Sequence, residues 1–163
     1  KLVGVLFADL GLYAPDFRAA ERTAQILWQV AGRVRTGGEV IIQTLSPDER
    51  AVAAAARGDY DAFLLAELAE RRRLGYPPFK RVMLIEAAHR QPERAEELLL
   101  ELKPRLEELP ELEVLGPAPA PHFKVNNLYR YRLLVKRPRG FDMRKLAFLK
   151  EVRGIKVDVD PIE

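Results

Sequence analysis

The segment Tyr76-Pro77-Pro78-Phe79 divides this chain of 163 residues into two parts with different patterns of apolar residues. Two successive prolines remove backbone donors and restrict the backbone, so neither a helix nor a central strand continues through them. Before this segment the apolar residues predict one strand–helix–strand unit followed by helices. After it they predict a different order of strands and helices, so we place a domain boundary here.

The first part begins with two apolar segments typical of buried strands, residues 2–6 and 40–44. Between them, residues 17–31 have apolar side chains at helical spacing, and Asp16 is a suitable N-cap. Strand, helix and strand in this order form one βαβ unit, which predicts an α/β fold for residues 1–45.

Residues 46–80 are predicted to form a helical connector that ends in the proline-rich linker. Ser46, Pro47 and Glu49 are typical of a helix start, with the serine as N-cap and the proline at the first helical position. Gly58 then ends this helix, and Asp59 is expected to cap a second one.

Residues 81–163 are predicted to form a separate α+β domain. Its expected elements follow the order β-α-β-β-α-β, with strands at 81–88, 112–115, 129–136 and 155–160 and helices at 92–109 and 142–152. This is the order of a ferredoxin-like split βαβ fold, in which helices cover one face of the sheet. The proline-rich residues 116–121 are expected to form an extended arm.

The composition excludes several classes of site. The chain is 48% apolar and 31% charged, as expected of a globular protein, and it has no apolar run long enough to span a membrane. It has no cysteine and only two histidines, so we predict no disulfide, no thiol catalysis and no metal site. The absence of a signal-peptide pattern predicts a cytoplasmic location and no membrane partner.

Positive charge is concentrated in the last quarter of the chain. Residues 121–163 contain eleven basic and five acidic side chains, although the net charge of the whole chain is only +3. Strand alternation places Arg130, Arg132 and Lys136 on one face, which we expect to be the open face and to bind a polyanion. The full set of predicted DNA- or partner-binding residues is Lys124, Arg130, Arg132, Lys136, Arg137, Arg139 and Arg144.

Several long segments, in order along nearly the whole chain, resemble the PriA family of primosomal replication-restart helicases. They are LVGVL (2–6), ADLGL (8–12), PDFRAAER (15–22), QVAGR (29–33), EVIIQT (39–44), LGYPPF (74–79), VLGPAP (114–119) and VDVDP (157–161). The resemblance implies that residues 1–45 are the end of a RecA-like helicase lobe, with motifs V and VI. It also implies that residues 81–163 are a C-terminal DNA-binding domain.

The resemblance further implies a function and a set of partners. Family members bind branched or single-stranded DNA and the acidic tail of single-stranded DNA-binding protein, start primosome assembly, and unwind DNA from 3′ to 5′ with ATP. The Walker motifs and the zinc insertion of the family are absent from this sequence. We therefore expect no cofactor here, and we expect the chain to be a fragment whose ATP, magnesium and zinc sites lie upstream.

A nucleotide site is also implied, at motif VI. Gln29 and Gly32 would contact the nucleotide, and Arg35 or Arg33 would act as an arginine finger on the transferring phosphoryl group. The motif is one residue shorter than the family's Q-x-x-G-R-x-G-R and lacks the second glycine. Because a shift of one residue turns a helical side chain by about 100°, a working finger and a solvated remnant of a lost site both remain open.

Two other functions also remain open. The chain could be a non-catalytic scaffold for primosome proteins, or a ribosomal-type RNA-binding module. The basic patch could also hold an acidic peptide, with Lys136, Arg139 and Arg144 as contacts.

Overall fold

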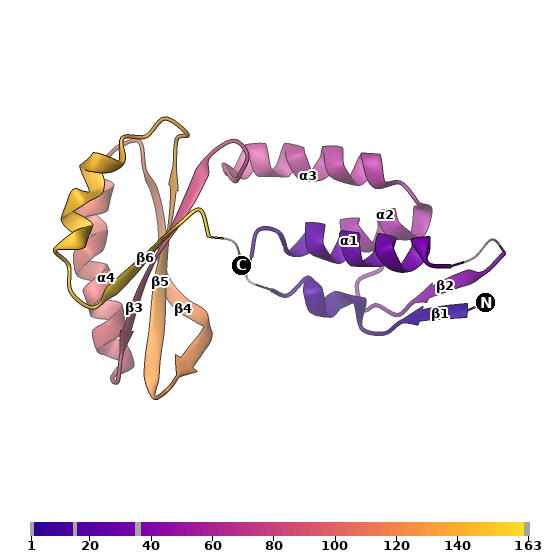
Figure 1. Ribbon diagram of the computed structural model, residues 1–163, viewed down its shortest axis with the longest axis horizontal. Helices are drawn as coiled ribbons and strands as arrows, with labels where there is room; N and C mark the ends of the chain where they lie inside the picture. Colours follow the sequence, from indigo (N-terminus) through magenta and orange to yellow (C-terminus); the bar gives the residue numbers. More distant parts are fainter. Residues whose placement is uncertain (1, 15, 35–36, 162–163) are drawn as a thin grey trace. The chain divides into compact units, whose positions relative to one another are not determined.

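The computed structural model describes residues 2–14, 16–34 and 37–161 of a mixed α and β chain with two separate sheets (Figure 1). The chain divides into two compact units, Lys1–Glu70 (unit 1) and Arg71–Glu163 (unit 2).

Unit 1 contains the predicted strand–helix–strand order. Strand β1 (Leu2–Val5) pairs in parallel with β2 (Glu39–Ile42), and α1 (Ala19–Gly32) lies between them in the sequence. A short 3-10 helix, η1 (Ala8–Gly11), follows β1 directly.

Small side chains bring the helices of unit 1 into contact. Ala24 of α1 packs with Ala51 and Ala54 of α2 (Arg50–Arg57) and with Phe63 of α3 (Tyr60–Leu74). Alanine lets the helix backbones approach closely, and the larger ring of Phe63 fills the remaining space. These contacts form the core of unit 1 beside the two-stranded sheet.

The predicted start of α2 is wrong at Ser46. The helix begins at Arg50, and its cap is Glu49, whose carboxylate accepts a hydrogen bond from the Ala51 amide at 2.7 Å. Ser46 instead donates its backbone N–H to the Thr44 hydroxyl, which itself donates to Asp9 at 2.7 Å. The serine is therefore held by the turn that follows β2.

Unit 2 contains a four-stranded antiparallel sheet in the order β4-β5-β3-β6. Helices α4 and η2, the latter a 3-10 helix, lie on one face of this sheet (Figure 1). The elements are β3 (Arg81–His89), α4 (Pro92–Glu107), β4 (Glu113–Val125), β5 (Leu128–Arg137), η2 (Met143–Lys150) and β6 (Ile155–Val159). The most deeply buried side chains of the core between sheet and helices are Met83, Ile85, Leu99, Leu106, Leu133 and Val135. Unit 2 is thus an α+β domain.

Strand β4 differs most from the prediction, because the short strand expected at 112–115 and the extended arm expected at 116–121 belong to one long strand. The strand runs from Glu113 to Val125 at the edge of the sheet. Proline is tolerated at an edge because only one side of the strand must supply hydrogen bonds. Two register shifts against β5 accommodate the proline-rich stretch.

A two-residue turn joins β4 to β5. Val125 and Leu128 are paired, and both Asn126 and Asn127 have positive φ angles, 51° and 61°. Two successive left-handed residues are the geometry of a type I′ hairpin turn, and asparagine adopts it more readily than most side chains. This hairpin was not expected from the sequence.

Candidate nucleic-acid interface

The sheet face opposite the helices presents Arg130 and Arg132, as strand alternation predicts. Their neighbours Leu133 and Val135 point the other way, into the core. The two arginines border a hollow of about 310 Å³ whose other lining residues are Leu84, Glu86, Ala120, Pro121 and His122. The polar face and the apolar face of β5 are therefore where the sequence places them.

Arg130 is bound to a carboxylate of the same face. Its Nε and Nη2 donate to the two carboxylate oxygens of Glu86, each at 2.7 Å. The two side chains are 28% and 21% exposed. A planar, two-point pair of this kind neutralises both charges at short range. Arg130 can therefore contact a phosphate only in competition with Glu86.

Lys136 does not lie exposed on this face, and that expectation is wrong. Its side chain is 5% exposed, and its ammonium donates to the Leu74 carbonyl at 2.8 Å and to Glu113 at 2.9 Å. The same ammonium lies 4.4 Å from the ring centroid of Tyr76. The segment around Leu74 and Tyr76, together with β4, covers this end of the face, so Lys136 is a structural cation.

The Lys136 ammonium also lowers the pKa of Glu113, chiefly through its hydrogen bond and with a further contribution from Lys80. Lys80 binds the other oxygen of this carboxylate at 3.0 Å. Glu113 therefore joins β4 to the linker and to β5 through two charged contacts.

Arg137 is also buried rather than available for DNA. Its side chain is 8% exposed and donates to Asp160 at 3.1 Å. Arg81 donates to the same oxygen of Asp160 at 3.4 Å. This aspartate follows β6, so the arginine secures the end of the sheet.

Arg139 and Arg144 are both exposed, in the segment after β5. Arg144 binds the carboxylate of Asp142 at 3.0 Å, and this contact lowers the pKa of Asp142. The Asp142 carboxylate also caps η2 by accepting the Arg144 backbone N–H. Arg144 is thus positioned at the start of η2 while most of its side chain stays in solvent.

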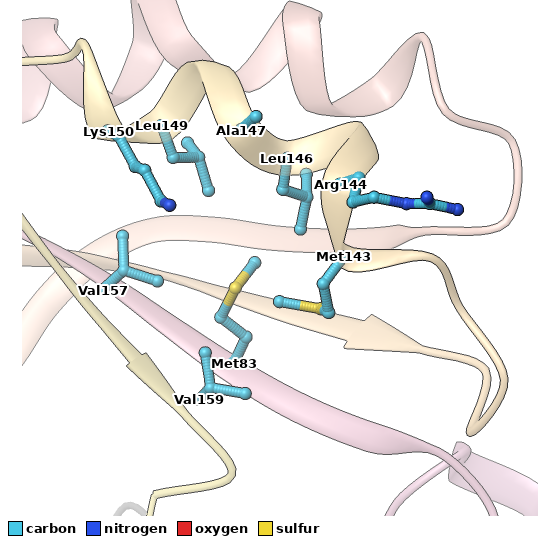
Figure 2. Close-up of a pocket in the computed structure, with 9 residues that line it drawn as sticks. All are labelled: Met83, Met143, Arg144, Leu146, Ala147, Leu149, Lys150, Val157 and Val159. Atoms are coloured by element: carbon cyan, nitrogen blue, oxygen red, sulfur yellow. The ribbon is translucent and has the colours of Figure 1, made fainter.

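Beneath η2 lies an apolar pocket of about 510 Å³ (Figure 2). Figure 2 shows Met83 of β3, Leu146 and Leu149 of η2 converging in it, with Arg144 and Lys150 at opposite ends. The full lining is Met83, Met143, Arg144, Leu146, Ala147, Leu149, Lys150, Val157 and Val159. An apolar floor with a cation at each end is suited to an apolar side chain flanked by carboxylates.

Lys124 lies far along β4, near the hairpin turn. Its ammonium donates to the Tyr129 hydroxyl at 3.1 Å and lies 4.7 Å from the centroid of that ring. It borders a second hollow of about 510 Å³ with Arg90, Asn126, Asn127 and Tyr129. The structure thus separates the predicted basic set into an open-face group, a hairpin group, a group in the segment after β5, and the two buried cations Lys136 and Arg137.

The residues predicted at the nucleotide site lie at the C-terminal end of α1. Gln29, Gly32 and Arg33 are exposed, and Gly32 is the last residue of the helix. Arg35 lies outside the described residues. The C-terminal end of a helix presents carbonyl groups and a partial negative charge, which disfavours phosphate. Here any contact with a nucleotide would have to come from side chains.

Sequence reasoning missed several polar residues of these surfaces, among them Glu86, Arg90, Glu113, Asn126 and Asn127. Alternation within residues 81–88 places Glu86 on the same face as Val82 and Leu84, so that residue was within reach of the same argument. Glu113 and Arg90 approach their neighbours only through the pairing of β3, β4 and β5. Nothing in the local sequence indicates such contacts.

In the ranges that the structure covers, no group of three or more histidine, cysteine or carboxylate side chains is arranged to hold a metal ion. Nor does any helix in those ranges have the length and apolar character needed to cross a bilayer.

Comparison with known proteins supports the resemblance. The family model described as primosomal protein N C-terminal domain matches residues 72–162. The chain is 37% identical to the replication restart protein PriA of Treponema pallidum, over 99% of this chain and 26% of that protein. It is 35% identical to the PriA protein of Synechocystis, over 99% of this chain and 21% of that protein. It is 36% identical to the PriA protein of Haemophilus influenzae, over 98% of this chain and 24% of that protein. The chain spans about a quarter of the length of these curated relatives.

Proposed function

The chain belongs to the family of the primosomal protein N C-terminal domain, and from this premise we propose that unit 2 binds DNA in replication restart. The match corresponds to the C-terminal region of PriA-family proteins. In this proposal residues 81–163 are a ferredoxin-like DNA-binding domain, and its strand order supports that assignment. Residues 46–80 would connect it to residues 1–45, the end of a RecA-like helicase lobe.

The observation that carries the proposal is a set of basic side chains on described surfaces of unit 2 away from its helices. Arg90 and Lys124 are exposed at the hairpin and Arg139 is exposed after β5, while the half-buried Arg132 lines the open face. Arginine and lysine at such positions can bind backbone phosphates without reading bases. Lys136 and Arg137 are not part of this interface, because both are buried against partners of the same unit.

The test is direct binding of the whole chain to labelled forked, single-stranded and duplex DNA, measured by fluorescence anisotropy at several salt concentrations. We expect the affinity to fall steeply with salt, because each neutralised phosphate releases counterions. Arg132→Gln should weaken binding to all three DNAs. No detectable binding to any of them at low salt would contradict the proposal, and tighter binding to structured RNA would favour the RNA-binding alternative.

A second candidate function is docking of an acidic protein tail, such as that of single-stranded DNA-binding protein, in the pocket beneath η2. Its support is the apolar floor with Arg144 and Lys150 at the ends (Figure 2). Lys150→Glu should weaken binding of an acidic peptide with an apolar C-terminal residue by repelling its carboxylates. Arg57→Glu, an exposed change at the end of α2, is the matched control. Equal losses in both variants would argue against this pocket.

The chain by itself is proposed to act by binding rather than by unwinding. We propose that ATP-driven 3′-to-5′ unwinding, with its ATP, magnesium and zinc sites, requires more of a PriA-type protein than the quarter that this chain spans. A DNA-stimulated ATPase assay on the chain alone should therefore show no turnover. If the chain binds other primosome proteins but not DNA, the non-catalytic scaffold function replaces the proposed DNA-binding function.

A further inference from the structure

The tip of the β4–β5 hairpin contains a hollow whose polar lining consists of groups that donate hydrogen bonds. This hairpin hollow, of about 510 Å³, is lined by Arg90, Lys124, Asn126, Asn127 and Tyr129. Two of these side chains are cations, two are amides and one is a phenol. Within the described part of the chain no carboxylate contributes to this lining. The lining of the hollow therefore carries net positive charge.

The sheet brings these residues together from three strand ends (Figure 1). His89 is paired with Tyr129 at the end of β3, and Lys124 is paired with Tyr129 from β4. Immediately after β3, the His89 ring nitrogen Nδ1 accepts the backbone N–H of Gln91 at 3.0 Å. This contact forms the turn that contains Arg90, which lines the hollow beside the hairpin.

Aromatic packing holds the tip in one shape. The Phe123 ring lies 5.3 Å from the Tyr129 ring and 5.4 Å from the Tyr131 ring, between centroids. Lys124 donates to the Tyr129 hydroxyl at 3.1 Å. Because that hydroxyl accepts from lysine, its own proton remains available for an acceptor in the hollow. The donors are thus arranged before a ligand arrives, which limits the entropy lost on binding.

We propose that the hairpin hollow binds a backbone phosphate of a DNA strand, an inference that rests on the DNA-binding function proposed above. Arg90 and Lys124 would supply charge, and the two asparagine amides with the Tyr129 hydroxyl would supply directed hydrogen bonds. A phosphodiester has two unesterified oxygens that share one negative charge and accept several hydrogen bonds. A neutral ligand would leave the positive charge of both cations unbalanced.

The test uses the full chain, a labelled oligothymidylate and anisotropy measured across a range of salt concentrations. Arg90→Gln combined with Lys124→Gln should reduce the magnitude of the log–log salt slope by about 0.7, since the hollow would hold one phosphate and each single-strand phosphate contact contributes about 0.7. Arg50→Gln combined with Arg57→Gln removes the same charge from exposed positions of α2 and should leave the slope unchanged. Circular dichroism of each variant checks that it is folded.

A second pair of changes separates hydrogen bonding from charge. Glycine accepts the positive φ angles of the turn, so Asn126→Gly with Asn127→Gly keeps the hairpin and removes both amides. We expect a loss of affinity of about threefold to tenfold with an unchanged salt slope.

The outcomes distinguish this inference from the proposed function. If the unmodified chain binds the oligonucleotide and both hairpin variants bind as well as the α2 control, the hairpin hollow is not a contact and the function stands. If the unmodified chain does not bind DNA at all, both proposals fail. If the chain binds RNA of the same sequence more tightly than DNA, and the hairpin variants lose that binding, the assignment to DNA is overturned. It is also overturned if the hairpin variants lose binding to an acidic peptide but keep their affinity for DNA.

Discussion

Arg130 and Glu86 form a two-point ion pair on the open face of the unit 2 sheet, with both nitrogen–oxygen distances at 2.7 Å. The pair places a carboxylate on the surface that we assign to DNA, in the same hollow as Arg132. The Glu86 carboxylate neutralises the Arg130 guanidinium and would also repel a DNA phosphate. Glu86 therefore limits how tightly this face can bind DNA.

The first prediction concerns removal of that acid. Glu86→Gln should raise affinity for single-stranded DNA about two- to fivefold at low salt, because Arg130 gains an unbalanced charge. Arg130→Gln should lower affinity, since it leaves the carboxylate unpaired. Anisotropy titrations measure both, and Glu101→Gln, an exposed change on α4, is the control. An affinity in Glu86→Gln equal to that of the control would show that DNA does not contact this face.

The second prediction separates structure from binding at Lys136. Lys136→Met should lower the free energy of unfolding by about 1–3 kcal/mol, because the Leu74 carbonyl and Glu113 lose a buried donor. DNA affinity of the folded variant should stay unchanged. Urea unfolding measures the stability, and Lys156→Met, at an exposed position of β6, should cost less than about 0.5 kcal/mol. If Lys136→Met is as stable as the unmodified chain but binds DNA poorly, Lys136 is a DNA contact and not a structural cation.

The third prediction is the pH dependence of the same contact. The pKa of Glu113 is lowered in the folded chain from its ordinary value of 4.5, mainly by the hydrogen bond from Lys136. A lowered pKa stabilises the fold above about pH 4.5, and this stabilisation is lost as the pH falls through the folded-state value.

The Glu113 side chain is 41% exposed, so solvent screens its charged contacts. Glu113→Gln should therefore be less stable than the unmodified chain by only about 0.5 kcal/mol at pH 6, and the difference should shrink toward pH 3. Urea unfolding at a series of pH values measures the gap. Glu108→Gln, an exposed change just after α4, is the control for the loss of one carboxylate. A gap that stays constant between pH 6 and pH 3 would mean that ionisation of Glu113 does not contribute.

Much of the fold could be predicted from local pattern. The order of elements and the two faces of β5 follow from apolar periodicity, and Asp59 caps α3 as expected by accepting from Ala62 at 3.1 Å. The length of β4 could not be predicted in this way. Its prolines indicate irregular backbone, and only the edge position in the sheet explains why they are accepted.

The sheet face that carries the candidate site could be predicted from the sequence, but the pairing and exposure of its basic side chains could not. Alternation gives the face of Arg130, Arg132 and Lys136, and it is local information. Whether a cation on that face is open, paired or covered depends on residues distant in sequence: Glu86 for Arg130, and Leu74 with Glu113 for Lys136. Tertiary contacts thus decide which members of a basic cluster can meet DNA.

The last prediction tests the irregular edge strand at Gly116. This residue has a φ angle of +101°, and a Cβ there would lie 2.9 Å from the Arg132 carbonyl oxygen and 3.1 Å from the Ala118 nitrogen. Both neighbours are backbone atoms of paired strands, so neither can move without disturbing the β4–β5 pairing. Gly116→Ala should therefore lower the free energy of unfolding by about 1–3 kcal/mol.

Gly140→Ala provides the matched control, because its added Cβ would meet no atom within 4 Å and its φ angle is not in the left-handed range. That change should be neutral or slightly stabilising, by up to about 1 kcal/mol, since alanine restricts the unfolded chain. Gly116→Ala should also weaken DNA binding through the hairpin, because β4 positions Lys124. Equal stability of the two variants in urea would show that β4 tolerates a side chain at Gly116, and that its pairing with β5 is looser than the structure indicates.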